Sequence, residues 1–336
     1  MSTPSRPATT HGTHAAAGDV ARAGGSVGGG TDVHQHLWPE PLVEALRARS
    51  GPPLLRGWSL HLAGEPVFEV TPRDHDPALR AERELAAGRA RVLVSLSTPL
   101  GIEELPAGEA EPLLEAWHEG AAALPRPFGH WASVRTPAPG EPHDLEALDR
   151  AAAGGAVGLQ LGAHLLASPH TLEQHAPLLE RCAALGLPVL VHPGPVAAVA
   201  GAPGWWPAVA QYPAQLQAAW WAWTAVGRSL LPGLRIAFAA GAGLAPVHHE
   251  RLAARGGPRR AVDPGVFVDT SSYGHQGIDA LVRALGIDAV VLASDRPYAE
   301  PADEAVGTQL GEAALHAIAR TNPARLLGQL NEGATA

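Results

Sequence analysis

Residues 31–36 read TDVHQH, a short strand-like run that ends in two histidines. Seven further short, apolar runs follow along the chain, and longer segments with helical spacing separate them. The eight runs cover residues 31–36, 91–96, 129–134, 156–161, 188–192, 234–239, 265–269 and 288–293. Runs this short and this apolar are typical of strands that are buried on both faces, as in a parallel sheet.

The segments between these runs favour helices. Residues 145–153 lead into Gly154, residues 172–185 stop at Gly186, and residues 278–285 stop at Gly286, so that each helix would end at a glycine cap. Eight strand–helix repeats predict an α/β protein, specifically a closed (β/α)8 or TIM barrel. A doubly wound open sheet with additional strands is the alternative.

The chain divides into a central domain and two tails. Residues 1–30 are rich in Ser, Thr, Gly and Ala and predict a flexible tail, the barrel would span 31–331, and 332–336 would form a C-terminal tail. Residues 37–90 form a long insertion after the first strand, in which 60–70 favour a β-hairpin about Gly64-Glu65. Because barrel loops that follow strands lie at the C-terminal mouth, this insertion is either a lid or an excursion without a role there.

Composition excludes several classes of protein. The 336 residues include no lysine, which excludes P-loop, Schiff-base and pyridoxal-phosphate chemistry. The single cysteine, Cys182, excludes an internal disulfide and Cys-rich metal sites, and we expect it to be a small buried side chain. The net charge of −9 argues against nucleic acid and membranes as partners. Without a signal-like or membrane-spanning segment, we expect a cytoplasmic protein.

Four side chains of the types that bind metals are predicted to meet at the barrel mouth. His34 and His36 lie two apart on the first strand, so both face the same side. His192 ends the fifth run, and Asp295 follows the eighth. The carboxyl ends of barrel strands form the active-site face. Three imidazoles and one carboxylate suit one divalent ion, Zn²⁺ first and Mn²⁺ as the alternative.

These ligands, with the Ser294-Asp295 pair and the segment NPARLLG at 322–328, resemble the amidohydrolase superfamily from about residue 31 to 328. The match is closest to its amidohydrolase-related branch, which includes aminocarboxymuconate-semialdehyde decarboxylase, resorcylate-type decarboxylases and dicarboxylate lactonases. The resemblance implies that His34, His36, His192 and Asp295 bind one metal and that Asp295 also moves protons. Members with two metals use a bridging carbamylated lysine, and this chain has no lysine. The branch also has a histidine after strand six, where this chain has Ala240.

Three functions follow from this resemblance. We predict first a metal-dependent hydrolase of a small organic ester, lactone or amide, in which a metal-activated water attacks and Asp295 transfers its proton. The alternative is a non-oxidative decarboxylase of an aromatic or dienoic acid. The third is a metal-binding barrel that is catalytically impaired because Ala240 replaces the histidine.

Other side chains are candidates for contact with the small-molecule substrate. They are Trp58, His61, His164, Trp205, His248 and Arg296. Trp58 and His61 could close over a planar substrate, and Arg296 could hold a carboxylate. A solvated or capping role is the alternative for His164 and His248, as it is for His249 and His275, which also follow strands. The helical face of Leu216, Trp220, Trp223 and Gly227 predicts packing on the barrel, with a homodimer interface as the alternative.

Overall fold

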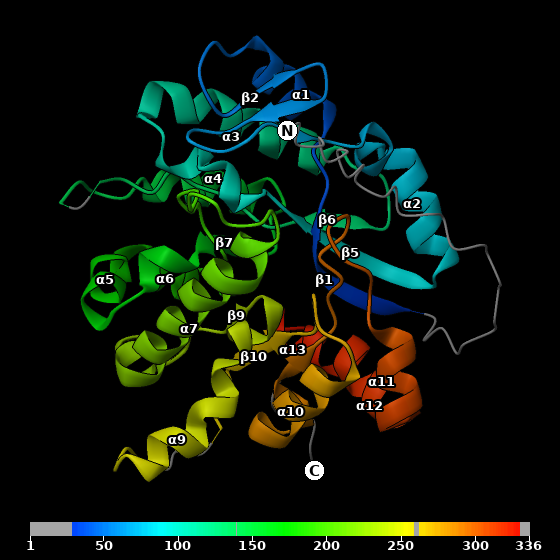
Figure 1. The fold of residues 1–336 in the computed structure, drawn as a ribbon, viewed down its shortest axis with the longest axis vertical. Coiled ribbons are helices and arrows are strands. Elements are labelled where there is room, and N and C mark those ends of the chain that lie inside the picture. Colours follow the sequence, from blue (N-terminus) through cyan, green and yellow to red (C-terminus); the bar gives the residue numbers. More distant parts are fainter. Residues whose placement is uncertain (1–28, 139, 259–261, 330–336) are drawn as a thin grey trace, which may run out of the picture.

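The computed structural model describes residues 29–138, 140–258 and 262–329 (Figure 1). Most of the predicted 1–30 tail and the whole of the 332–336 tail lie outside these ranges. None of the helices in the described part of the chain combines the length and the apolar character that a membrane span requires.

Eight parallel strands build the centre of the molecule. They are β1 (Gly30–His36), β5 (Arg89–Ser95), β6 (Phe128–His130), β7 (Leu159–Gly162), β8 (Val189–His192), β9 (Ile236–Phe238), β10 (Val266–Asp269) and β11 (Val290–Val291). Each overlaps one of the eight predicted runs. The strands form two parallel sheets, β1-β5-β6 and β7-β8-β9-β10-β11.

Backbone hydrogen bonds join the two sheets into a ring. On one side, Ala132 pairs with Leu159, since Ala132 N donates to Gly158 O at 2.8 Å and Gln160 N donates to Ala132 O at 2.8 Å. On the other side, Val33 N donates to Leu292 O at 2.9 Å, and Asp295 N donates to His34 O at 2.9 Å. The sheet is therefore closed, which confirms the predicted barrel.

Alternate residues of the strands fill the barrel interior. On β8, Val189 and Val191 pack in the outer layer with the helices, whereas Leu190 packs inside with Val33 and Phe267. His192, two residues beyond Leu190, continues this inward direction to the mouth. Trp131 is fully buried in the interior, and its indole N–H donates to Val33 O at 2.9 Å.

Helices surround the ring (Figure 1). They are α2 (Pro77–Ala86), α3 (Ala107–Ala122), α4 (Leu145–Ala153), α5 (Pro169–Gln174), α6 (Ala176–Ala184), α7 (Tyr212–Ala222), α8 (Arg228–Leu230), α9 (His249–Ala254), α10 (His275–Leu285), α11 (Asp303–Leu310), α12 (Glu312–His316) and α13 (Asn322–Leu326). The predicted helix at 145–153 is confirmed as α4. The one predicted at 172–185 is two helices, because α5 ends at Gln174 and α6 begins at Ala176, with Pro177 in its first turn. Cys182 is buried on α6, as predicted.

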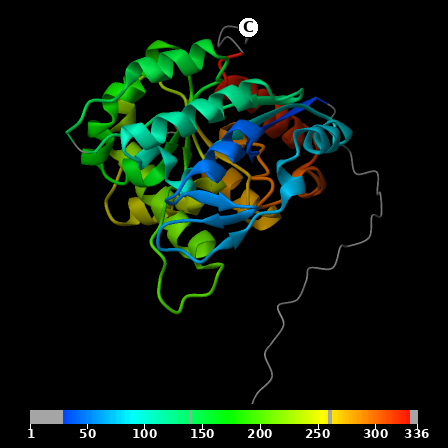
Figure 2. The same ribbon diagram turned by 90° about the horizontal axis from the view of Figure 1, so that it is seen from above.

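The insertion after β1 holds α1 (Glu40–Ala48) and a small antiparallel sheet of β2 (Leu54–Arg56), β3 (Ser59–His61) and β4 (Phe68–Glu69). The β3–β4 pair, with Ser59 opposite Glu69, confirms the predicted hairpin. Strand β2 was not predicted, because three residues give too short a pattern. The small sheet lies on the same side of the barrel as the long loop after β8 (Figure 2).

The tryptophan-rich face of α7 and of the helical turn that follows it packs within the chain. Leu216 is fully buried, and Trp220 and Trp223 are each 4% exposed in the core that also contains Phe238. This confirms the predicted packing on the barrel. A homodimer stays a prediction.

Candidate active site

The four predicted metal ligands come together at the C-terminal mouth of the barrel. His34 and His36 come from β1, His192 ends β8, and Asp295 follows β11; each offers one ligand atom, and all four atoms lie within 4.8 Å of one another. The three imidazole centroids are 4.9 to 5.0 Å apart, and the ring planes cross at 80 to 84°. The rings are thus arranged around one common point.

The spacing of these atoms fits a bound divalent ion. Nε2 of His34 lies 3.2 Å from Nε2 of His36, close to the roughly 3.3 Å expected between two nitrogens on one tetrahedral zinc. Oδ1 of Asp295 lies 3.2 Å from Nε2 of His36 and 3.6 Å from Nε2 of His34. This buried oxygen has no hydrogen-bond donor among the described residues. A cation bound among the four ligands would satisfy it.

The outer nitrogen of each imidazole has a hydrogen-bond partner. Nδ1 of His34 lies 2.9 Å from Oδ2 of Asp269, Nδ1 of His36 lies 3.1 Å from Ser95 O, and Nδ1 of His192 lies 2.8 Å from Pro193 O. With Nδ1 donating, Nε2 is free to bind a metal, which is the tautomer that metal-bound histidines need.

Asp269 is a site residue that the sequence analysis missed. It ends β10, its side chain is fully buried, and its second oxygen accepts hydrogen bonds from Ser271 N at 3.0 Å and Ser271 Oγ at 2.6 Å. The available signal was a carboxylate at the C-terminal end of a predicted barrel strand.

The surroundings of the three histidines shift their pKa values in different directions. Burial lowers the pKa of His36 and lowers that of His192 well below the ordinary value, so both stay neutral. Burial also acts on His34, but the hydrogen bond to Asp269 and the charge of Asp295 outweigh it and raise its pKa. A proton therefore competes with a metal chiefly at His34.

A bulge in β1 sets the direction of its histidines. Asp32 pairs with Val92, but Gln35 pairs with Val94, so β1 has an extra residue between these positions. The buried carboxylate of Asp32 accepts hydrogen bonds from His34 N at 3.1 Å, Gln35 Nε2 at 2.8 Å and Ser294 N at 3.2 Å. Asp32 thus ties the bulge to the segment that carries Asp295.

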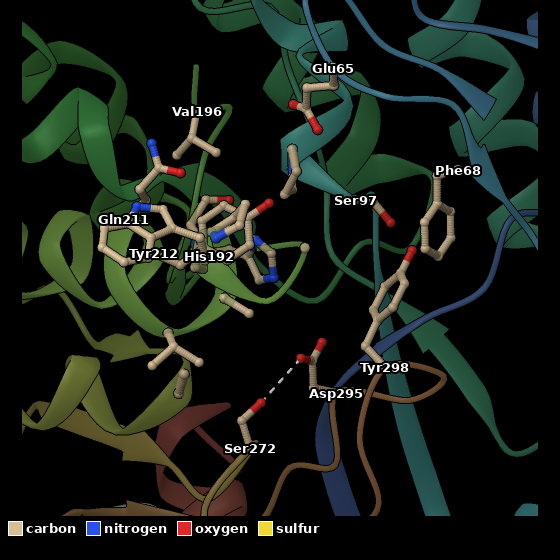
Figure 3. Close-up of a pocket in the computed structure, with 18 of the residues that line it drawn as sticks. Glu65, Phe68, Ser97, His192, Val196, Gln211, Tyr212, Ser272, Asp295 and Tyr298 are labelled. Carbon is tan, nitrogen blue, oxygen red and sulfur yellow. Dashed lines mark hydrogen bonds between the residues drawn. The ribbon is translucent and has the colours of Figure 1, made fainter. Parts of the chain in front are cut away.

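A cavity of about 720 Å³ opens beside the four ligands (Figure 3). Its wall is mainly apolar and is built by the hairpin, the loop after β8 and the start of α7. Large apolar side chains in this wall are Trp38, Leu60, Phe68, Leu100, Val196 and Trp206. No arginine is among the described residues of the wall. Hairpin residues Leu60 and Phe68 are therefore part of this wall, and a lid role of the insertion stays a prediction.

Three tyrosines line this cavity, Tyr212, Tyr273 and Tyr298, and the pKa values of two of them are strongly raised. Tyr298 is 52% exposed at the open cavity, and desolvation by the surrounding protein raises its pKa to about 12. Burial, together with the charges of Glu65 and Asp295, raises the pKa of Tyr212 to about 12. Both phenols therefore stay protonated and can donate hydrogen bonds at neutral pH.

None of the six side chains predicted to bind the substrate is among the described residues that line the cavity. Trp58 stacks on His75 with 6.1 Å between the ring centroids, and the guanidinium of Arg47 lies 5.1 Å from the ring centroid of Trp58. Trp205 is 57% exposed, and its neighbour Trp206 lines the cavity instead. His61 ends β3 and is half-buried.

The remaining three candidates have other surroundings. His164 Nε2 lies 2.7 Å from Glu104 Oε1, and His248 is exposed. Arg296 does not hold a substrate carboxylate here, since its guanidinium pairs with Glu84 at 2.6 Å and Glu300 at 2.8 Å. These ion pairs hold the Arg296 side chain away from the cavity, and Arg296 is not among the described residues of its wall.

Ala240 lines the cavity, and no histidine replaces the one expected there. Residues 240–244 all have positive φ, and Ala240 N donates to Ser271 Oγ at 3.1 Å. His249, another candidate, accepts the indole N–H of Trp220 at 3.2 Å. Apart from the three ligands, no histidine is among the described residues that line the cavity.

Comparison with known proteins places this site in a family. The sequence model of the amidohydrolase family matches residues 31–329. No curated protein matches the chain. Three similar solved structures share its fold. IDCase of Metarhizium anisopliae in apo form is 20% identical with a TM-score of 0.73, and the match covers 90% of this chain and 98% of that one. The 5-carboxyvanillate decarboxylase of Sphingomonas paucimobilis is 19% identical with a TM-score of 0.64, and the match covers 90% of this chain and 99% of that one. The 5-carboxyvanillate decarboxylase of Novosphingobium aromaticivorans, in complex with manganese and 4-hydroxy-3-methoxy-5-nitrobenzoic acid, is 18% identical with a TM-score of 0.64, and the match covers 91% of this chain and 97% of that one.

The family match covers the barrel together with all four metal ligands. It agrees with the resemblance that these ligands and the segment at 322–328 suggested. The chain therefore belongs to the amidohydrolase family and is a TIM-barrel enzyme of the amidohydrolase superfamily with a site for a divalent metal.

Proposed function

We propose that this enzyme is a non-oxidative decarboxylase of a small planar aromatic or dienoic acid. The observation that carries the proposal is the cavity beside Asp295, which is mainly apolar and has no arginine among its described residues. Two of the similar structures are named decarboxylases, and this likeness also favours decarboxylation over the hydrolysis that the sequence analysis put first.

An apolar cavity favours decarboxylation for an electrostatic reason. The reaction converts a localised carboxylate charge into neutral carbon dioxide, so apolar walls that exclude water favour the uncharged product. A divalent ion held by His34, His36, His192 and Asp295 would supply a Lewis acid that anchors the substrate's carboxylate and a neighbouring hydroxyl. The donor set suits Zn²⁺ and Mn²⁺, and one similar structure contains manganese.

Asp295 is the proposed proton donor. Its carboxylate lies beside the imidazoles of His34 and His36, its Oδ2 lies 3.5 Å from Ser272 Oγ, and the side chain is 19% exposed to the cavity. In its protonated form, Asp295 donates this proton to the carbon that bears the substrate's carboxylate and becomes a carboxylate itself; the carbon–carbon bond then breaks, its electron pair stays on that carbon, and carbon dioxide leaves. Solvent restores the proton to Asp295.

One proton transfer is all that this reaction needs. Asp295 supplies it, while Tyr212 and Tyr298 stay protonated and orient the substrate as hydrogen-bond donors. Ala240 therefore removes no group that decarboxylation requires, and its small side chain leaves room for a ring in the cavity. This argues against the third interpretation, an impaired barrel.

The test is a product analysis in D₂O. Protein loaded with Mn²⁺ or with Zn²⁺ is offered hydroxybenzoates and dienoic acids in one series and lactones and esters in another. We expect carbon dioxide release and one deuterium at the carbon that lost the carboxylate. Hydrolysis products without carbon dioxide would overturn the proposal. Metal-loaded protein that turns over neither series would favour the impaired barrel.

A further inference from the structure

Glu65 occupies the loop between β3 and β4, at the end of the cavity opposite Asp295. Its side chain is directed into the cavity from the hairpin (Figure 3). Glu65 and Asp295 are the two carboxylates among the described residues that line the wall. The cavity thus has one carboxylate at the hairpin end and one at the end that holds the metal ligands.

No described residue forms an ion pair or a side-chain hydrogen bond with the Glu65 carboxylate. Partial burial raises its pKa, and together with Asp295 it raises the pKa of Tyr212, so the phenol lies in the field of both carboxylates. The residues around Glu65 in the hairpin are apolar, including Leu62, Val67 and Phe68. A partly buried carboxylate without a protein partner is available to accept a hydrogen bond from a bound ligand or to pair with its positive charge.

The position of the metal ligands orients any substrate relative to Glu65. An acid whose carboxylate lies at the His34, His36 and Asp295 cluster directs its far end toward the hairpin. The wall at that end contains Glu65 and the neighbouring Tyr212, and no arginine is among its described residues to bind a second carboxylate. The charges of the cavity therefore discriminate between substituents at the far end.

We infer that Glu65 selects acids that carry a hydrogen-bond donor or a positive charge, such as an amino group, at the end remote from the reacting carboxylate. It repels acids that have a second carboxylate there. This inference rests on the proposed decarboxylation, because it assumes that the reacting carboxylate binds at the four-ligand cluster. It makes Glu65 a specificity-determining residue that takes no part in the chemical step.

The experiment compares the binding of three 2-hydroxybenzoates with aminomethyl, hydrogen or carboxylate at the position para to the reacting carboxylate. Dissociation constants are measured by calorimetry on Mn²⁺-loaded protein. We expect wild-type protein to bind the aminomethyl acid at least tenfold more tightly than the dicarboxylate. Glu65→Gln should remove most of this ratio, and Glu65→Arg should reverse it. Each affinity is expressed relative to that of the unsubstituted acid for the same protein, and the bound Mn²⁺, measured by elemental analysis, shows that the site is intact.

Glu69→Gln is the matched control on the same hairpin. Glu69 lies on β4, is exposed, accepts a hydrogen bond from Ser59 Oγ at 2.7 Å and is not among the wall residues, so wild-type ratios are expected. A ratio that Glu65→Gln leaves unchanged, a preference of wild type for the dicarboxylate, or failure of all three acids to bind would overturn the inference. Binding is measured without turnover, so selective binding with no carbon dioxide release would refute the decarboxylation alone.

Discussion

Nδ1 of His34 lies 2.9 Å from Oδ2 of Asp269, although the two residues are 235 positions apart in the chain. Both side chains are buried. The contact joins β1 to β10, two strands that are not neighbours in the ring because β11 lies between them. It fixes the orientation of one metal ligand through a residue that does not itself bind the metal.

Replacing Asp269 should weaken metal binding. In Asp269→Ala the His34 ring loses its hydrogen-bond acceptor, so we expect the affinity for Mn²⁺ or Zn²⁺ to fall by about 10- to 100-fold. Competition with a chelator measures this affinity. Asp279→Ala, which removes an exposed carboxylate paired with Arg283, is the control and should bind metal as wild type does. Equal affinity in the two variants would contradict a positioning role for Asp269.

Replacing Asp295 should abolish the proton transfer. We expect Asp295→Asn to lower kcat for carbon dioxide release by about 10² to 10⁴, the range for loss of a general acid. The rate is compared at metal concentrations that saturate both proteins, with bound metal measured by elemental analysis. An Asn variant that holds metal and keeps its wild-type rate would show that another group delivers the proton.

Metal binding should stabilise the folded protein. At a metal concentration about 100 times Kd, binding to the native state alone adds about 2.7 kcal/mol to the free energy of unfolding, which calorimetry detects as a higher Tm. A chelator should reverse the rise. His192→Ala removes one of the four ligands, so metal should raise the Tm of this variant much less than that of wild type. An undiminished rise in this variant would place the metal elsewhere.

Stability should depend on pH through Glu103. Burial raises the pKa of Glu103 to about 7, although Ser133 Oγ donates to it at 2.7 Å. Because the folded value exceeds the ordinary 4.5, this group's contribution to stability is full below pH 4.5 and is lost as pH rises through 7. The difference amounts to about 3 kcal/mol.

Glu103→Gln, which cannot ionise, should therefore lose stability less steeply than wild type between pH 5 and pH 8.5. Urea unfolding at several pH values measures the free energy of unfolding of both proteins. Parallel pH profiles would mean that Glu103 is ionised or solvated in the folded state.

Arg296 should matter for stability more than for substrate binding. Its ion pair with Glu84 is buried at 7% and 0% exposure, so Arg296→Gln leaves Glu84 without its partner and should cost about 3–5 kcal/mol of unfolding free energy. The exposed pair Arg283–Asp279 supplies the control, since Arg283→Gln should cost less than about 1 kcal/mol. A large rise in KM without loss of stability would restore the substrate-binding role.

Some of the site was within reach of sequence reasoning because it depends on local pattern. Alternation along a strand placed His34 and His36 together, and the positions of His192 and Asp295 after apolar runs placed them at the same mouth. The side chains that line the cavity could not be predicted from the sequence. Trp206 rather than Trp205 lines it, because the direction of a side chain in a long loop has no sequence period.

By itself the sequence determined the eight strands, the parallel barrel and the four ligands, because buried apolar runs, strand alternation and the common C-terminal edge are all local or topological rules. Only the tertiary structure decided which buried carboxylate orients His34, where Arg296 finds its partners, and that Glu65 faces the cavity. Each of these depends on the bulge in β1, the closure of the ring or the fold of the hairpin. Such contacts join distant residues, and their energies depend on three-dimensional distance.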